Sequence, residues 1–424
     1  MKNRFLFGGL LLWSFFASGQ QISKRKIERL ISAIPAFQQA HVGVNVVALD
    51  KQKTVAAHRE EHYMTPASNT KLLTFLGALQ TFDSLPALEY WQENDSIIHF
   101  RSTAYPLLLH PFYSDVALFS FFKQKRLWSY HTHNQHPKPL GEGWAWDDYN
   151  YYYAAESSAF PIYGNSVQAV MRPEGPELTP KFFVLKDTLS APLSRRRNIN
   201  AFSFHPSKWQ INDTLYRPFI TSDSLFTRLL KEATHQQVVI NESHGEEVLW
   251  KKLYTNHDDL LYKGLLQDSD NGLAEALLLM IAKEKTGILT PNTAIKALQE
   301  EWSAWLPDPI EWADGSGVSR YNMVTPRTLV AVLKQIYSSL NREQLQAYFP
   351  KSGSSGTLKA YAELKNVYAK TGTLRHNHNL SGYWISAQGK PYAFSIMVNH
   401  YTSPTVEIRR GITALITALQ KKLK

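Results

Sequence analysis

Strand-like patterns at both ends of the chain constrain its fold more than any other feature of the sequence. Near the N-terminus, "HVGVNVVALD" (41–50) alternates valine with other residues, and "TVAAHR" (54–59) follows after a short turn. Near the C-terminus, three successive strands are predicted in "LKNVYAKTGT" (364–373), "LSGYWISAQ" (380–388) and "PYAFSIMVNHY" (391–401). We expect these five segments to form one antiparallel sheet that joins the early and late thirds of the chain.

Amphipathic helices are predicted beside these strands. Residues 22–36 place Ile22, Ile27, Leu30 and Ile31 on one side, and "TVEIRRGITALITALQKKL" (405–423) has the same character. These terminal helices would cover one face of the sheet, and helices from the middle of the chain would cover the other. The predicted fold class is therefore α/β, with an antiparallel sheet between helical layers.

The composition of the chain changes at about residue 85. Aromatic residues, prolines and polar clusters dominate until about residue 216, and helical periodicity is weak there. We interpret residues 85–215 as an inserted, mostly β region. The sheet-and-helix domain would then comprise residues 20–84 and 216–424.

The first residues, "MKNRFLFGGLLLWSFFASGQQ", predict a secretory signal peptide. Lys2 and Arg4 precede a short apolar stretch, and small residues at 17–19 predict cleavage after Gly19. We expect an exported, periplasmic protein with no later transmembrane segment. The chain has no cysteine, so its stability must come from a packed core. The formal net charge of +10 falls to +8 when Lys2 and Arg4 are removed.

A serine and a lysine lie three residues apart in "TPASNTKLLT" (65–74), at the start of an apolar helix. Residues at this spacing share one helix face, so Ser68 and Lys71 are expected to touch. A buried, neutral lysine can take the proton of a serine nucleophile. The spacing alone is weak, because Ser23–Lys26 and Ser120–Lys123 repeat it and Ser68 could simply cap the helix.

Two further segments supply candidate partners. "SDNGLAEALLLMIAKEKTG" (269–287) begins with Ser269 and Asn271, although Ser269 or Asp270 could also be a simple helix cap. "AKTGT" (369–373) contains Lys370-Thr371-Gly372 in a strand, where the glycine permits close approach of a ligand. Lys285-Thr286-Gly287 repeats the triplet, but there it is a helix C-terminus signal.

Ser-x-x-Lys, Ser-x-Asn and Lys-Thr-Gly in this order resemble the motif set of penicillin-interacting serine enzymes. Together with "DGSGVSRYNMVTP" (314–326) and "SSGTLK" (354–359), they resemble the S13 family of D-alanyl-D-alanine carboxypeptidases/endopeptidases, of the penicillin-binding protein 4 type. The resemblance implies a transpeptidase-like α/β domain interrupted by a large insertion. "WDDYNYYYAAESSAFPIYGN" (146–165) resembles a segment of that insertion.

The resemblance also implies residue roles. Ser68 would attack the carbonyl of a D-Ala–D-Ala bond, Lys71 would be the base, and Ser269 would pass a proton to the leaving D-alanine. Asn271 would hold the peptide backbone, and the backbone N–H groups of Ser68 and Thr373 would form an oxyanion hole. The substrate carboxylate would be held by Lys370 and Thr371, beside Gly372. The partners implied are peptidoglycan peptides ending in D-Ala–D-Ala and β-lactam antibiotics.

Several alternatives remain from the sequence. A β-lactamase-like hydrolase would need a dedicated deacylation base, and a non-catalytic peptidoglycan-binding scaffold would be expected to have lost motifs that are intact here. The tyrosines of residues 146–165 could stack on sugars, but we expect them in the core of the insertion. "SRRRN" (194–198) is expected to be an exposed loop. We expect no cofactor, no metal at "HTHNQH" (131–136) and no nucleic-acid partner.

Overall fold

The computed structural model describes residues 21–188, 193–205, 209–242 and 248–423. The predicted signal peptide, residues 1–19, lies outside the described residues. Among the helices of the described part, none combines the length and apolar character needed to span a bilayer.

The predicted sheet is present and joins the two ends of the chain. Its strand order is β14-β15-β16-β1-β2, and every neighbouring pair is antiparallel. The strands are β1 (His41–Ala48), β2 (Lys53–His58), β14 (Val367–Leu374), β15 (Asn377–Ile385) and β16 (Pro391–Asn399). β1 pairs directly with β16, with Val44 opposite Ile396, so the early and late segments share one ladder.

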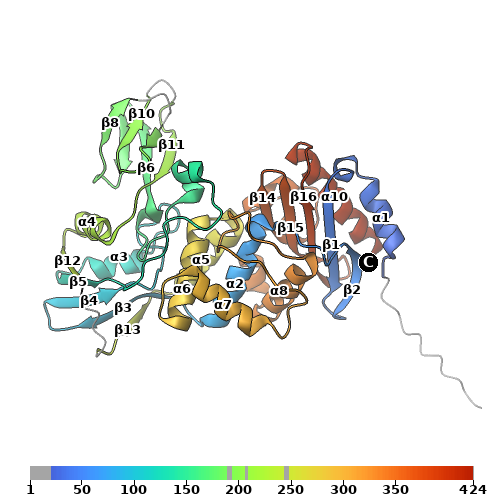
Figure 1. The fold of residues 1–424 in the computed structure, drawn as a ribbon, viewed down its shortest axis with the longest axis horizontal. Helices are drawn as coiled ribbons and strands as arrows, with labels where there is room; N and C mark the ends of the chain where they lie inside the picture. Colours follow the sequence, from blue (N-terminus) through green and yellow to red (C-terminus); the bar gives the residue numbers. More distant parts are fainter. Residues whose placement is uncertain (1–20, 189–192, 206–208, 243–247, 424) are drawn as a thin grey trace, which may run out of the picture.

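Helices from both termini cover one face of this sheet, as predicted (Figure 1). These are α1 (Lys24–Ser32) and α10 (Thr405–Lys422). The alternating Val42, Val44 and Val46 belong to the same buried cluster as residues of both helices. The helix expected over 22–36 is shorter than predicted, because Pro35 begins a separate turn, η1 (Pro35–Phe37).

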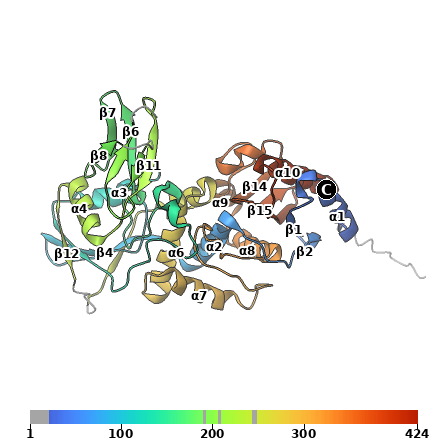
Figure 2. The same ribbon diagram turned by 45° about the horizontal axis from the view of Figure 1, so that its top comes forward.

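The opposite face carries helices from the middle of the chain (Figures 1 and 2). They include α2 (Lys71–Thr81), α6 (Asn271–Thr286) and α8 (Pro326–Ser339), with α5 (Asp258–Lys263), α7 (Pro291–Trp302) and α9 (Arg342–Tyr348) nearby. α8 approaches β1 closely, since a Cβ added to Gly43 would lie 2.7 Å from Pro326. α6 is followed by Gly287, whose φ of 73° is the left-handed conformation expected of a helix stop.

The inserted region forms a second lobe, in whose described residues there are three sheets. Its five-stranded sheet has the order β12-β5-β4-β3-β13 and mixes parallel and antiparallel pairs. These strands are β3 (Pro86–Gln92), β4 (Ile97–Arg101), β5 (Leu127–His131), β12 (Gln237–Asn241) and β13 (Lys251–Tyr254). Two of them follow residue 215, where the insertion was expected to end. We therefore propose that the inserted region extends to about Tyr254.

Two small sheets project from this lobe (Figure 1). One has the order β11-β6-β7 and the other β8-β10-β9. Their strands are β6 (Ser166–Arg172), β7 (Gly175–Thr179), β8 (Leu185–Thr188), β9 (Leu193–Arg195), β10 (Phe202–Phe204) and β11 (Thr214–Pro218). Helices α3 (Val116–Phe122) and α4 (Asp223–Thr234) pack beside the larger sheet, where Phe122 and Phe226 contact Phe100. The mostly β character expected of the insertion is thus observed.

Candidate active site

The predicted serine–lysine pair lies where a short turn leads into α2. Ser68 belongs to the turn η2 (Ala67–Thr70), and Lys71 is the first residue of the helix. The Lys71 ammonium nitrogen, Nζ, lies 3.1 Å from Ser68 Oγ. It also donates to Asn271 Oδ1 at 2.7 Å and to the Ser316 carbonyl at 2.7 Å. The side chain of Lys71 is therefore fixed toward the serine by partners from two distant parts of the chain.

A second contact, which the sequence did not predict, joins Lys370 to Ser269. Lys370 lies on β14, and its Nζ donates to Ser269 Oγ at 2.7 Å. Ser269 has a φ of 61°, a left-handed conformation that is uncommon for a residue other than glycine. It lies between a π-helical turn, η7 (Gly264–Asp268), and α6, whose N-cap is Asp270 rather than Ser269. Backbone strain of this kind is concentrated at functional sites.

Burial lowers the pKa of both lysines. The pKa of Lys71 falls to about 8 because the side chain is fully removed from water, although the carboxylates of Asp314, Glu275 and Asp270 oppose the shift. Burial also lowers the pKa of Lys370 well below its ordinary value, and the neighbouring charge of Lys71 lowers it further. Desolvation is therefore what brings Lys71 toward its neutral form.

The remaining predicted residues are Thr371, Gly372 and Thr373, which lie on the same strand as Lys370. Thr371 is buried and its Oγ1 donates to Thr357 Oγ1 at 2.8 Å, whereas Thr373 Oγ1 contacts His378 Nδ1 at 2.7 Å. Gly372 packs directly against the turn that carries Ser68, since an added Cβ would lie 2.9 Å from the Asn69 nitrogen. Only glycine allows this approach of β14 to η2.

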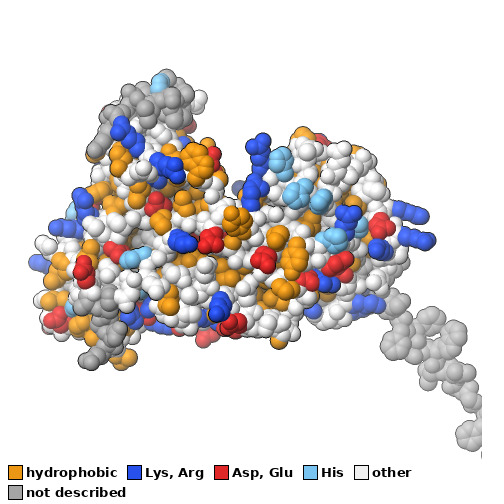
Figure 3. All heavy atoms as spheres, in the orientation of Figure 1, with side chains coloured by type: hydrophobic (Ala, Val, Ile, Leu, Met, Phe, Trp, Pro, Cys, Tyr) orange, Lys and Arg blue, Asp and Glu red, His pale blue; other side chains and the backbone are white. Residues whose placement is uncertain are grey.

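A cleft of about 690 Å³ opens above Ser68. Ser269, Asn271 and Thr373 line it together with Ser68, while Lys71 and Lys370 are buried behind these residues. Asp147, Asp148 and Tyr153 from the insertion line it as well, as do Arg320 and Arg375 from the sheet-and-helix domain. Figure 3 shows the molecule hollowed between its two lobes. The candidate site thus uses residues of both lobes.

The loop at 314–319 was not given a role from the sequence, yet it holds Lys71 through the Ser316 carbonyl. Glu275 on α6 is fully buried and accepts from the backbone N–H groups of Gly315 at 3.0 Å and Ser316 at 2.8 Å. Burial and the nearby Asp314 raise the pKa of Glu275 to about 7. The only sequence signal for this arrangement is an acidic residue inside an apolar helix.

Asp314 organises the same loop. It accepts from the backbone N–H groups of Gly317 at 2.8 Å and Ser319 at 2.6 Å, and from the Trp144 indole N–H at 2.9 Å. Trp144 belongs to the insertion, so this bond ties the second lobe to the loop that orients Lys71.

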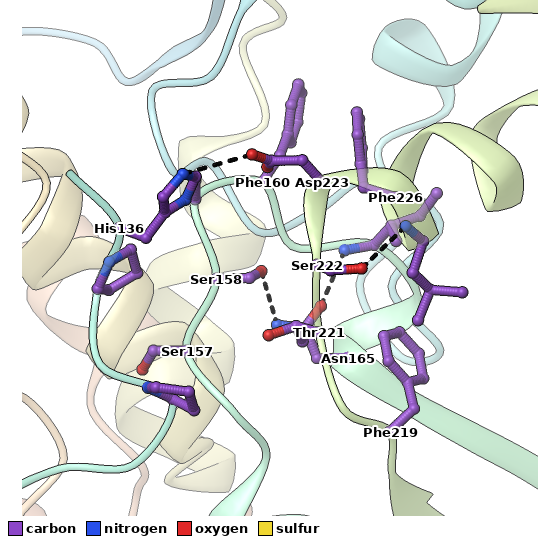
Figure 4. Close-up of a pocket in the computed structure, with 15 residues that line it drawn as sticks. His136, Ser157, Ser158, Phe160, Asn165, Phe219, Thr221, Ser222, Asp223 and Phe226 are labelled. Carbon is purple, nitrogen blue, oxygen red and sulfur yellow. Dashed lines mark hydrogen bonds and ion pairs between the residues drawn. The ribbon is translucent and has the colours of Figure 1, made fainter. Parts of the chain in front are cut away.

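A further pocket, of about 400 Å³, lies within the insertion (Figure 4). His136 and Asp223 point toward one another across it, with 3.5 Å between Nε2 and Oδ2. The adjacent Ser222 hydroxyl accepts from the Leu225 N–H as the cap of α4, and so it is not arranged as a nucleophile beside His136. This pocket shares no lining residue with the cleft above Ser68.

The three histidines of residues 131–136 do not converge. His131 contacts His99 at 2.7 Å, His133 contacts the Ser102 carbonyl at 3.0 Å, and His136 faces Asp223. Within the ranges that the structure describes, no group of three or more His, Cys, Asp or Glu side chains is placed to hold a metal ion.

The sheet between helical layers, with a Ser-x-x-Lys turn beside a Lys-Thr-Gly strand, defines a penicillin-binding, transpeptidase-like fold. Comparison with known proteins then gives the family. The D-Ala-D-Ala carboxypeptidase 3 (S13) family model matches residues 23–87 and 218–419, which is more than half of the chain. The chain belongs to this family.

Individual relatives agree with this assignment. D-alanyl-D-alanine carboxypeptidase DacB of Haemophilus influenzae is 33% identical over 180 residues, 40% of this chain and 37% of the relative. The crystal structure of penicillin binding protein 4 from Haemophilus influenzae superposes with a TM-score of 0.69 at 21% identity, covering 94% of this chain and 99% of that one. A predatory peptidoglycan endopeptidase from Bdellovibrio bacteriovorus has a TM-score of 0.52 at 13% identity, covering 91% and 93%. The sequence match thus spans little more than a third of the first relative, and the structural matches establish the fold.

Proposed function

We propose that this protein is a serine-type D-Ala–D-Ala carboxypeptidase, endopeptidase or both, which acts on peptidoglycan peptides through an acyl-enzyme at Ser68. The observation that carries the proposal is the contact of 3.1 Å between Lys71 Nζ and Ser68 Oγ at the base of a cleft. Membership of the S13 family and the similarity to D-alanyl-D-alanine carboxypeptidases support it. The basic leader sequence supports a location in the cell envelope.

In the acylation step, Ser68 Oγ attacks the carbonyl carbon of the bond between the two D-alanines while Lys71 takes the hydroxyl proton. Such base assistance contributes roughly 10²–10⁴-fold to a rate. The backbone N–H groups of Ser68 and Thr373 would stabilise the oxyanion, where the loss of one donor typically costs about 3 kcal/mol. Ser269 would pass the proton that Lys71 has taken from Ser68 on to the departing D-alanine amine, and water would then hydrolyse the ester.

Substrate binding would shift the positive charge from Lys71 to Lys370. Without substrate, three carboxylates raise the pKa of Lys71, whereas the charge of Lys71 lowers the pKa of Lys370. A substrate carboxylate beside Lys370 and Thr371 would raise the pKa of Lys370, because an opposite charge favours the ammonium form. The resulting positive charge would lower the pKa of Lys71 and increase the fraction of Lys71 that is free base. The enzyme would thus be activated by the group that identifies a chain end.

The covalent step is tested with benzylpenicillin. We expect its mass to be added to one tryptic peptide, that containing Ser68, and we expect Ser68→Ala to abolish both this adduct and D-alanine release. A folded Ser68→Ala protein that releases D-alanine at the parent rate would contradict the proposal. The lifetime of the adduct also distinguishes the proposed peptidase from a β-lactamase, since a β-lactamase would release hydrolysed penicillin within seconds rather than retain it.

A further inference from the structure

Two segments that the proposed reaction does not use meet on the surface of the second lobe. The first is the aromatic stretch that begins at Trp146, and the second is the basic run at 194–198. The backbone N–H of Arg195 donates to Asn150 Oδ1 at 2.9 Å, and the Arg195 guanidinium lies 5.3 Å from the centre of the Tyr149 ring. These contacts join segments that are some 45 residues apart in the sequence.

Residues 196–198 of the basic run are exposed, as expected, but the turn that they form is organised around one buried arginine. Arg195 is buried, and its Nη1 donates to the carbonyls of Arg196 at 3.2 Å and Arg197 at 2.9 Å. The buried guanidinium thereby holds the backbone that carries the exposed Arg197. The Arg197 guanidinium in turn lies 4.9 Å from the centre of the Trp146 ring.

Three aromatic rings nearby face solvent, and two of them belong to tyrosines that we expected in the core of the insertion. Trp146 is 64% exposed, Tyr151 52% and Tyr153 42%. Tyr151 and Tyr153 stack with 5.4 Å between ring centres and an interplanar angle of 7°. A group of large aromatic side chains on a surface is typical of a binding site, whereas single exposed hydrophobic residues are common. We call Trp146, Tyr151, Tyr153 and Arg197 the aromatic–arginine platform.

The platform borders the cleft above Ser68 through Tyr153, which belongs to both. Asp147 and Asp148 also line the cleft, whereas the rings of Trp146 and Tyr151 lie outside its lining. Figure 3 shows orange and blue side chains gathered on the wall of the hollow, over the elements coloured teal and green in Figure 1. A ligand that reaches Tyr153 in the cleft would therefore meet the platform, because the Tyr153 ring stacks on Tyr151.

We propose that the aromatic–arginine platform binds the glycan strand of peptidoglycan while a stem peptide of that strand occupies the cleft; this rests on the proposed function. Stem peptides are attached to a chain of β-linked N-acetylated amino sugars, so a peptide that reaches Ser68 brings its strand to the rim of the cleft. The apolar faces of pyranose rings pack on flat aromatic rings. The Arg197 guanidinium would bind the carboxylates of neighbouring stem peptides, for which its fork of donors is suited.

This arrangement has a consequence for catalysis. Contacts to a part of the substrate that does not react increase the time that the substrate spends bound at the reacting centre. We therefore expect the platform to favour strand-attached peptides over free stem peptides. The chemistry at Ser68 would be unchanged, because Trp146 and Tyr151 contact none of the reacting groups.

Binding is measured first in the Ser68→Ala background, where no covalent step intervenes. The probe is peptide-free glycan strands prepared with an amidase. We expect Trp146→Ala and Tyr151→Ala each to weaken binding about five- to tenfold, as for loss of one stacking ring. Trp146→Phe, which keeps a ring, should recover most of the affinity. Tyr254→Ala is the matched control, because Tyr254 is 47% exposed on β13 and lies outside the platform.

Polyglutamate is the second probe, because it offers carboxylates without sugar rings. We expect it to bind at least tenfold more weakly than the glycan strands. The proposal would be overturned if both polymers bound equally well, and if Arg197→Ala abolished this binding while Trp146→Ala did not affect it. That result would show a charge patch for acidic polymers. The proposal would also be overturned if Tyr254→Ala weakened glycan binding as much as Trp146→Ala does.

Turnover is measured with Ser68 intact, on two substrates. Trp146→Ala should raise the KM for a glycan-linked muropeptide about fivefold and leave kcat/KM for the free pentapeptide within about twofold. Equal losses on both substrates would contradict a strand-binding role. If no variant releases D-alanine but the glycan affinities still follow the platform residues, the proposed peptidase function fails and the platform stands.

Discussion

The rate at which penicillin acylates Ser68 should depend on pH through the pKa of Lys71. That pKa is lowered from 10.5 to about 8 by burial. At pH 7 a lysine of pKa 10.5 is about 0.03% free base, whereas one with a pKa of about 8 is about 9% free base. Burial therefore increases the population of the reactive form roughly 300-fold. The acylation rate should rise about tenfold per pH unit below pH 8 and level off above it.

The assay is the second-order rate of acylation by a fluorescent penicillin between pH 5.5 and 9.5, which reports the ionisation of the free enzyme. Asp270→Asn sharpens the test. The Asp270 carboxylate raises the pKa of Lys71, so removal of its charge should move the midpoint to lower pH and increase the rate at pH 7. Asparagine retains the cap bond that Asp270 accepts from the Leu273 N–H.

Lys285→Ala provides the control for this profile. Lys285 pairs with Glu301 at 2.7 Å at the far end of α6, so its removal should leave the midpoint in place. A rate that is independent of pH from 6 to 9 would refute Lys71 as the base. An Asp270→Asn midpoint that moves to higher pH would refute the electrostatic reasoning.

Three further predictions concern neighbouring groups. Lys370→Ala should reduce D-alanine release at least about 100-fold, and Lys285→Ala less than about twofold, since only Lys370 is buried beside Ser269; equal losses in folded variants would contradict the assignment. Gly372→Ala should abolish penicillin labelling and lower the melting temperature, because its methyl group would meet the backbone at Asn69; an unchanged labelling rate would show that the close approach has no role. Because the pKa of Glu275 is raised to about 7 in the folded state, its contribution to stability is present below about pH 4.5 and is lost as pH rises through 7. Denaturation of the parent and of Glu275→Gln across this window should therefore show the parent losing stability relative to the variant as pH rises, and parallel curves would exclude a raised pKa.

The sheet was predictable because each of its strands has a local pattern of hydrophobic residues. Alternation of valines in β1 fixes which side chains face α1 and α10, and the same rule holds for β16. The bounds of α6 follow from Asp270 at its start and Gly287 at its end, since capping depends on neighbours a few residues away. Motif order likewise indicated the residues that the structure places beside Ser68.

The insertion was less predictable because its pairing is not local. β12 and β13 lie after the shift in composition, yet each adds to an edge of the sheet begun by β3 and β4. Nothing in "QVVIN" (237–241) states that its partner is β5, about 110 residues earlier. Strand partners are chosen by the global packing of the lobe, and a pattern within one strand does not encode that choice.

The sequence by itself determined the sheet, its covering helices and the set of residues from which an acyl-transfer site could be made. Only the tertiary structure decided how those residues act. The pKa of Lys71 depends on removal from water and on three carboxylates, and its orientation depends on Asn271 and Ser316, more than 190 residues away. The exposure of Trp146 and its contact with Arg197 depend equally on how separate segments pack. Spacing in a sequence fixes which neighbours share a helix face or strand, whereas burial and electrostatic surroundings arise only when distant segments come together.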